Sequence, residues 1–441
     1  MKELQNREEK KDGWARAVVF TFTLVATSAN LSEISVSYLP WTAFALAFGL
    51  LLPYAFKELV LGRGIGRKSG SDGTSGGFPT FVPTILFLAA ICVPVLYGSD
   101  AVPALVALGK LSLILLVALP LFFARPKLAI TAFYALIAAV WVNFAMMAVG
   151  ILFGGPTGQQ MSPGRWGTIL NHPGPLWRLA SSVWFYSAYL TVKKRSSPQF
   201  LLLLASTTLI FLDGARAGIL LMIFQIATII VILAVERGCL LRIAAGAVVV
   251  IIGSLLFFRG SPGLGGIELP DQGAIARVGK FAVSMTSSGG TGLSDADVTR
   301  YEMLDNAIQR IHDHPVLGSG FGSTRIMTFA GPEDVHMTYL QIWANLGVAG
   351  LFFYVWLSWG WLPRAPRVLR KIREIEDVQT KALYYNAIAI LSLFVLGACT
   401  YPLGTEWSDW WTFLVAYTLV LSLMLSQAHS RRGPCPGYRS L

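Results

Sequence analysis

The feature that most constrains this chain of 441 residues is a series of long apolar runs that recur along almost its whole length. A helix needs about 20 mostly apolar residues to cross a bilayer, and about twelve segments approach that length. The expected spans are 14–31, 38–56, 80–98, 101–124, 128–153, 175–192, 199–212, 217–235, 240–258, 337–362, 382–401 and 409–427. Only 13% of the residues are charged, against roughly a quarter in soluble domains. The sequence therefore predicts an all-α polytopic membrane protein.

One of these boundaries depends on two charged residues. Residues 199–235 would form a single apolar run if Asp213-Gly214-Ala215-Arg216 did not interrupt it. An Asp and an Arg that face lipid in the middle of a membrane are costly. We therefore predict two helices joined by a tight turn, with both charges at the membrane surface.

Lys and Arg are distributed unevenly between the connecting segments. If the N-terminus is inside, the inner segments hold most of the Lys and Arg residues, whereas the short outer loops hold only Arg165 and Arg216. Cytoplasmic loops carry such an excess. We therefore expect both termini in the cytoplasm, and the net charge of +11 is interpreted as a topology signal rather than as nucleic-acid binding.

This orientation divides the chain into four parts. The prediction is nine spans in residues 1–258, one long outer loop at 259–336, three spans in 337–427 and a cytoplasmic tail at 428–441.

The outer loop carries one helical pattern after an irregular stretch at 259–298. Thr299-Arg300-Tyr301-Glu302 fits a capping box, and Tyr301, Leu304, Ile308 and Ile311 follow at helical spacing. We predict a short helix that begins at this box, has these four residues on its apolar face, and ends before Pro315.

Three arginines on the predicted outer side, Arg165, Arg216 and Arg300, are candidates for anion binding. A guanidinium group keeps its charge and binds phosphate through two parallel hydrogen bonds. The alternative for each arginine is snorkelling at the interface or an ion pair with a nearby acid, such as Asp213 with Arg216. Three arginines together on one face would favour a polyanion site.

His336 is the candidate general base, because it stands at the predicted start of a helix at the outer interface. The helix dipole and any nearby arginine disfavour the imidazolium form there, and neutral imidazole can accept a proton near physiological pH. Tyr339 and Trp343 would share its helical face. The alternative is a histidine that merely connects the loop to the helix.

Three weaker signals remain open. Asp295-Ala296-Asp297 resembles a divalent-metal motif, but acids before a helix also favour its dipole. Gly318-x-Gly320-x-Gly322 follows a helix instead of a strand, which argues against a dinucleotide loop. Lys110, in the middle of the fourth span, could line a cavity or pair with a carbonyl group.

Several segments resemble the O-antigen ligase and polymerase superfamily. The segments that carry this resemblance are Arg300–Leu304, Pro315–Gly320, His336–Gln341, Gly347–Leu351, Gly214–Gly218 and the region around Arg165. Two positions depart from the family pattern, since Met337 stands where the family often has Asn and Ala215 where it often has Ser. Neither departure removes a charged group.

The resemblance implies a GT-C-like glycosyltransferase of the bacterial inner membrane with a periplasmic active site. Such an enzyme would move O-antigen polysaccharide from undecaprenyl diphosphate to a sugar hydroxyl of lipid A-core, with inversion and without a metal or other cofactor. By the resemblance, the catalytic base is His336, the donor diphosphate is bound by Arg165, Arg216 and Arg300, and the supporting residues are Tyr339, Gly318 and Gly320.

Other functions stay open beside the ligase interpretation. A glycan polymerase would use the same donor chemistry. A solute transporter predicts charged residues near the membrane middle, where only Lys110 is clearly placed. A purely structural scaffold would leave the outer arginines without a role.

Overall fold

The computed structural model describes residues 2–28, 49, 51, 81–95, 101–154, 157–162, 165–168, 170, 173–236, 295–320, 326–328, 331–333, 335–401 and 407–430. The predicted span 240–258 lies outside the described residues, as do the predicted span 38–56 apart from residues 49 and 51 and the outer loop before residue 295.

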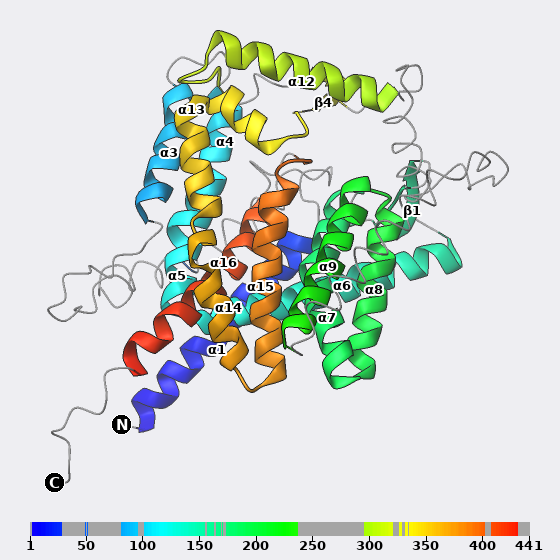
Figure 1. The fold of residues 1–441 in the computed structure, drawn as a ribbon, viewed down its shortest axis with the longest axis vertical. Coiled ribbons are helices and arrows are strands. Elements are labelled where there is room, and N and C mark those ends of the chain that lie inside the picture. Colours follow the sequence, from blue (N-terminus) through cyan, green and yellow to red (C-terminus); the bar gives the residue numbers. More distant parts are fainter. Residues whose placement is uncertain are drawn as a thin grey trace, which may run out of the picture. The chain divides into compact units, whose positions relative to one another are not determined.

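The described part is mostly helical, as the sequence predicted (Figure 1). Its helices are α1 (Lys2–Ser28), α3 (Phe81–Val95), α4 (Ala101–Ser112), the π-helical η1 (Leu113–Ala118), α5 (Leu119–Ala124), α6 (Pro126–Phe153), α7 (Pro175–Lys194), α8 (Ser197–Asp213), α9 (Arg216–Glu236), α12 (Asp295–Asp313), α13 (Thr338–Trp359), the 3₁₀ turn η3 (Leu362–Arg364), α14 (Ala365–Glu374), α15 (Val378–Gly397) and α16 (Trp407–Ser430).

Two short antiparallel strand pairs lie in the loops and were not predicted. β1 (Gly158–Ser162) pairs with β2 (Arg165–Thr168), and β3 (Ile326–Thr328) pairs with β4 (Gly331–Glu333). Each pair lets a loop satisfy its own backbone hydrogen bonds.

Four helical stretches in the described residues are long and apolar enough to cross a membrane: Pro126–Phe153, Arg216–Glu236, Thr338–Glu374 and Val378–Gly397. Shorter apolar helices occur at Gly13–Thr27, Val82–Val93, Leu108–Ala124 and Ser197–Asp213. The chain therefore has the apolar helices of a membrane protein, while the count of twelve spans stays a prediction.

The chain forms two compact units. The first comprises Met1–Ala139, Leu293–Glu374 and Leu383–Leu441, and the second comprises Val140–Gly292 and Ile375–Ala382.

The core of the first unit is built around Trp410, whose side chain is fully buried. Its ring centroid lies 5.2 Å from that of Phe394, 5.9 Å from that of Tyr354 and 6.0 Å from that of Phe87. These rings come from α15, α13 and α3, so one aromatic cluster joins four helices. Aromatic pairs at such separations add to the free energy of burial.

Helix α13 is broken at Gly347, whose φ of 67° and ψ of −175° are not helical. The rings of Tyr339 and Tyr354 lie 5.8 Å apart across the break. A straight helix would separate these residues by roughly 22 Å along its axis. The helix over the predicted span 337–362 is therefore not continuous, because its two halves turn back toward each other.

A loop from the same unit satisfies the backbone at this break. The N–H groups of Ser319 and Gly320 donate to the carbonyl oxygens of Ala344 (2.8 Å) and Asn345 (3.0 Å). In return, the N–H of Val348 donates to the carbonyl oxygen of Pro315 (3.0 Å). A backbone break in an apolar helix is tolerated where protein groups replace its lost hydrogen bonds.

Helix α12 ends before Pro315, as predicted, but it begins four residues before the expected capping box. Its packed face also differs from the prediction. Met303 and Ala307 are buried against Val335 and Ala344, with Ile311 beside them. The predicted face is wrong at two positions, since Tyr301 is 70% exposed and Ile308 is 50% exposed. The tertiary contacts with Val335 and Ala344 select a different side of the helix.

We predict that Gly347→Ala will destabilise the protein strongly. Its backbone lies in a region that only glycine adopts readily, which costs other residues about 1–3 kcal/mol. An added Cβ would also overlap the carbonyl group of Val316. Thermal unfolding of the detergent-solubilised protein, followed by tryptophan fluorescence, should show a clearly lower Tm.

Gly109→Ala is the matched control, because Gly109 lies inside α4 and a Cβ there meets nothing within 4 Å. This substitution should leave the Tm unchanged or raise it slightly. Equal Tm values for the two variants would contradict the role assigned to the break.

Candidate functional site

The turn between α8 and α9 confirms the predicted interruption of the apolar run. Helix α8 ends at Asp213, and Gly214 follows in the left-handed conformation with a φ of 71°. The Gly214 N–H donates to the carbonyl oxygen of Phe211 (3.1 Å), and α9 begins at Arg216. Both charged residues therefore stand at helix ends.

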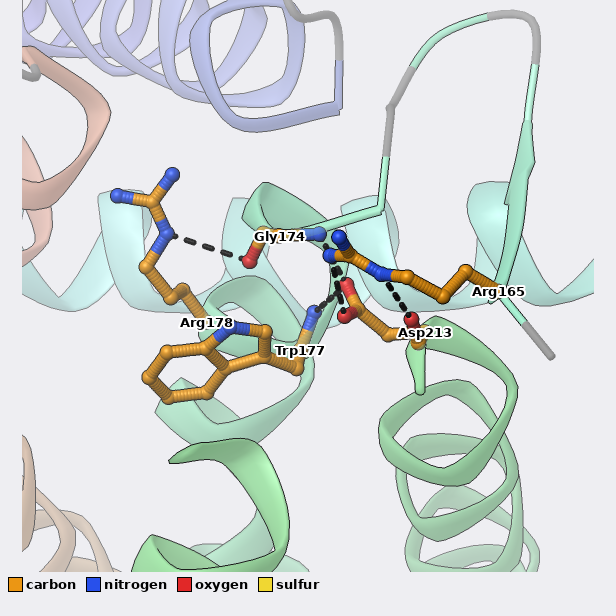
Figure 2. Close-up of polar contacts among 5 residues, drawn as sticks. All are labelled: Arg165, Gly174, Trp177, Arg178 and Asp213. Carbon is orange, nitrogen blue, oxygen red and sulfur yellow. Dashed lines mark hydrogen bonds and ion pairs between the residues drawn. The ribbon is translucent and has the colours of Figure 1, made fainter. Parts of the chain in front are cut away.

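The Asp213 carboxylate is fully buried and caps the start of another helix, α7. Its Oδ2 accepts the N–H of Gly174 (2.6 Å) and the N–H of Trp177 (3.1 Å). Figure 2 shows the carboxylate directed at these two main-chain groups. The N-cap residue Gly174 has no side chain that could cap α7, so a carboxylate from α8 performs this task. A negative charge at a helix N-terminus also complements the helix dipole.

Arg165 is the cation beside this carboxylate. It stands at the first position of β2, opposite Ser162 in the register of the hairpin. Its Nε donates to the main-chain oxygen of Asp213 (3.2 Å), and its Nη2 lies 3.7 Å from Oδ1. The sequence suggested Arg216 as the partner of Asp213, whereas the structure pairs Asp213 with Arg165, 48 residues away.

The strand pair that carries Arg165 is held against α6. The Oγ1 of Thr168, in β2, donates to Oδ1 of Asn143 in α6 (2.9 Å), and both side chains are buried. A buried hydrogen bond between two side chains restricts a loop that would otherwise be held only at its ends. The hairpin therefore gives Arg165 a defined position.

Arg178 is a further cation that the sequence analysis missed. It lies in the first turn of α7, and its Nε donates to the carbonyl oxygen of Gly174 (3.3 Å; Figure 2). A cation near the positive end of a helix is unfavourable by itself. The signal in the sequence was an arginine three residues after Pro175 in the Pro173-Gly174-Pro175 helix start.

Opposing effects act on the Asp213 carboxyl group. Burial raises its pKa above the ordinary value, while the charge of Arg165 has the largest effect in the opposite direction. The two N–H groups at the start of α7 and the charge of Arg178 also favour the ionised form. The carboxylate thus links two arginines electrostatically.

Close packing brings the start of α9 to the same end of α7. A Cβ at Gly218 would lie 3.0 Å from Cβ and Cγ of the Trp177 side chain. A side chain at this position would be tight against Trp177, and Arg216 is two residues away in the same helix. Arg165 and Arg178 therefore lie at one helix start in the second unit, and the helix that begins at Arg216 packs against α7 nearby.

His336 lies directly before the N-cap of α13, Met337, as predicted. Its ring is partly exposed and meets the ring of Tyr401 edge-on, with centroids 6.0 Å apart. The next residues are anchored, because Thr338 donates its N–H to the carbonyl oxygen of Ala398 (2.8 Å) and its hydroxyl to that of Tyr401 (2.6 Å).

Tyr339 and the two loop glycines contribute to structure. The Tyr339 hydroxyl donates to the carbonyl oxygen of Val395 (3.0 Å) and accepts the indole N–H of Trp359 (2.9 Å). Gly318 and Gly320 adopt φ values of 75° and 95° in the loop that supports the break in α13. His336 precedes the helix, so the predicted helical face shared with Tyr339 and Trp343 does not exist.

Arg300 is exposed and lies within α12, not at its first turn. It is three residues from Met303, which packs in a cluster with Val335. The arginine and His336 therefore belong to segments that one apolar cluster holds together in the first unit.

The remaining candidates lie near the ends of helices. Asp295 and Asp297 occupy the first turn of α12, where acids complement the dipole. Lys110 lies in the last turn of α4. In the part of the chain that the structure describes, no group of three or more His, Cys, Asp or Glu residues is arranged for a metal ion.

The candidate residues thus fall into two sets, each described within its own unit. Arg165 and Arg216 lie with Arg178 and Asp213 in the second unit, and Arg300 and His336 lie in the first.

Part of the chain is similar to a known protein family. Residues 200–355 match the family model described as O-antigen ligase. The match includes Arg216, Arg300 and His336, together with the break at Gly347, whereas Arg165 precedes it. A search of curated proteins found no match. Residues 200–355 of the chain are therefore similar to the O-antigen ligase family.

Proposed function

We propose that this protein transfers O-antigen polysaccharide from undecaprenyl diphosphate to a sugar hydroxyl of lipid A-core. The observation that carries the proposal is the match to the O-antigen ligase family over residues 200–355. This match supports a glycosyltransferase-like enzyme that acts on lipid-linked glycans. The donor, the acceptor and the roles below are our proposals.

The location that we propose is the periplasmic face of a bacterial inner membrane, with both chain termini in the cytoplasm. The excess of Lys and Arg in the expected inner segments supports this orientation. Nucleotide sugars are absent outside the cytoplasm, so the donor must carry its own activated leaving group. A polyprenyl diphosphate does so.

The arginines would bind the diphosphate and stabilise the negative charge that grows on it as the glycosidic bond breaks. Arg165 lies at the start of α7, where Arg178 adds a further cation, and Arg216 begins α9. Arg300 would contribute from α12. Fixed charges aimed at a developing anion can supply much of the catalytic effect, and they do so without a metal ion.

His336 would remove the proton from the acceptor hydroxyl as it attacks the anomeric carbon. The attacking oxygen forms its bond as the diphosphate leaves from the opposite face, so the configuration inverts. The proton passes to the imidazole ring, and the bond electrons leave with the diphosphate. Partial exposure of His336 at the start of α13 supports access of an acceptor.

A glycan polymerase is the alternative, because it uses the same donor chemistry and the superfamily includes both activities. For a ligase, deletion of the gene should abolish the lipopolysaccharide ladder on gels while lipid-linked polymer accumulates. A band of core with a single repeat unit would instead indicate a polymerase. Unchanged lipopolysaccharide together with defective solute uptake would favour a transporter.

We predict that Arg216→Lys will greatly reduce transfer in the purified enzyme supplied with lipid-linked donor. Lysine keeps the charge but loses the planar pair of donors that matches a phosphate group. Loss of one such stabilising contact typically costs about 10²-fold in rate.

Arg310→Lys is the control, because Arg310 is exposed in the last turn of α12. It should retain normal turnover. If Arg165→Ala, Arg216→Ala and Arg300→Ala all transfer at near-normal rates, arginines do not bind the diphosphate.

His336→Ala should lower transfer by about 10²–10⁴-fold, the usual contribution of a general base, and should leave donor binding nearly unchanged. His314→Ala, on the exposed segment after α12, should be close to normal. Transfer should survive EDTA, and Asp295→Ala combined with Asp297→Ala should have a mild effect. Loss of activity in EDTA with recovery in Mg²⁺ or Mn²⁺, together with an active His336→Ala variant, would establish a metal mechanism instead.

A further inference from the structure

The Asp213 carboxylate contacts two separate segments through its two different oxygens. Oδ2 accepts both N–H groups at the start of α7. Oδ1 is buried and accepts no hydrogen bond from the described residues, but it faces Nη2 of Arg165 at 3.7 Å. The carboxylate thus stands between the start of α7 and Arg165, a candidate for donor binding. We propose that Asp213 is a positioning residue, which holds α7 with one oxygen and orients the Arg165 guanidinium toward the donor with the other.

This inference rests on the proposed function, in which Arg165 binds the diphosphate. It adds a residue with no role in the chemistry itself, because the buried carboxylate has no exposed surface for a substrate.

The geometry of the pair differs from that of a purely structural ion pair. A structural pair of Arg and Asp would often use two parallel hydrogen bonds of about 2.7–2.9 Å. Here the Nη2–Oδ1 distance of 3.7 Å exceeds hydrogen-bonding range. The hydrogen bond that Arg165 makes in this contact comes from Nε and ends on the main-chain oxygen of Asp213. The carboxylate therefore attracts the terminal nitrogens without forming hydrogen bonds to them.

The exposed fractions of the two side chains also support a positioning role for Asp213. The Arg165 side chain is 29% exposed, whereas that of Asp213 is 0% exposed. A ligand can therefore approach the guanidinium from outside while the carboxylate stays covered. A buried charge is tolerated when it is paired and hydrogen-bonded, and the N–H groups of Gly174 and Trp177 meet part of that need.

The same contacts occupy part of a second possible anion site. The start of a helix commonly binds phosphate through its N–H groups. At α7, the N–H groups of Gly174 and Trp177 already donate to Asp213. A diphosphate in this region would therefore bind through the arginines rather than through the helix start.

Two substitutions separate the two tasks of the carboxylate. In Asp213→Asn, the amide oxygen can take the place of Oδ2 and keep the cap of α7. The amide NH₂ group then faces the guanidinium, so two donors meet and the attraction is lost. In Asp213→Ala, both the cap and the attraction are lost.

The test uses purified full-length protein in detergent and measures Tm, the binding of inorganic pyrophosphate, and the donor KM and kcat. Asp213→Asn should keep a Tm near that of the wild type, weaken pyrophosphate binding, and raise the donor KM about tenfold, within the range of direct pairwise coupling. Asp213→Ala should in addition lower the Tm.

The double variant Asp213→Asn with Arg165→Ala decides whether Asp213 acts through Arg165. If it does, pyrophosphate binding by the double variant should equal that of Arg165→Ala alone. If the double variant instead binds pyrophosphate more weakly than Arg165→Ala, by the factor that Asp213→Asn causes alone, the proposal is wrong. Normal pyrophosphate binding by Asp213→Asn would also overturn it.

Asp377→Ala is the matched control for the loss of a cap. Asp377 precedes α15, and its Oδ2 accepts the Thr380 N–H (2.8 Å) and the Thr380 hydroxyl (2.6 Å). Neither of these bonds involves an arginine. It should lower stability without changing pyrophosphate binding. If Asp377→Ala and Asp213→Asn lose pyrophosphate binding equally, Asp213 contributes only to the stability of the fold.

Failure of the proposed function would appear differently. If the wild-type protein binds pyrophosphate but transfers no glycan, and the Asp213–Arg165 coupling is present, the positioning role holds and the glycosyl-transfer proposal fails. If transfer is normal in the wild type and the coupling is absent, only the positioning role is wrong.

Discussion

Backbone N–H and C=O groups that neither water nor a regular helix can satisfy must find partners inside the protein. Much of the described structure near the candidate residues meets this requirement. At the break in α13, the carbonyl groups of Ala344 and Asn345 accept hydrogen bonds from the loop at Ser319 and Gly320. At the start of α7, a carboxylate from α8 takes the place of a local cap. Both places are irregular, and both lie beside residues with proposed roles in chemistry.

This requirement gives a structural meaning to two of the motifs that carried the family resemblance. Pro315–Gly320 and Gly347–Leu351 are separate in the sequence but form one unit, in which the loop supplies the backbone partners that the helix loses at Gly347. Gly347 is required because its conformation is closed to residues with a side chain. These segments position the helix that follows His336, and their glycines need no direct contact with a substrate.

Electrostatics organises the second unit in a similar way. Arg178 lies near the positive end of α7, where a cation alone would be unfavourable. Arg165 is held in a position where its side chain stays partly exposed. Asp213 balances both charges from a buried position. One acid beside two arginines leaves a net positive charge, which suits the diphosphate donor that we propose.

Local sequence determined the class of the protein and several boundaries. The apolar runs indicated a helical membrane protein, Asp213-Gly214-Ala215-Arg216 predicted the turn between α8 and α9, and Pro315 predicted the end of α12. In each case the cause lies within a few neighbouring residues, such as the cost of a charge in lipid or the conformational limits of proline.

Only the tertiary structure decided the features that depend on distant partners. The buried side of α12 follows from its contact with Val335 and Ala344, so exposed Ile308 could not be recognised from its spacing. Asp213 meets Arg165 across 48 residues instead of the nearby Arg216. The break at Gly347 is stable because a loop some 30 residues earlier supplies its hydrogen bonds. The spacing of apolar residues indicates which face a segment can bury, whereas the residues that cover this face depend on how the whole chain folds.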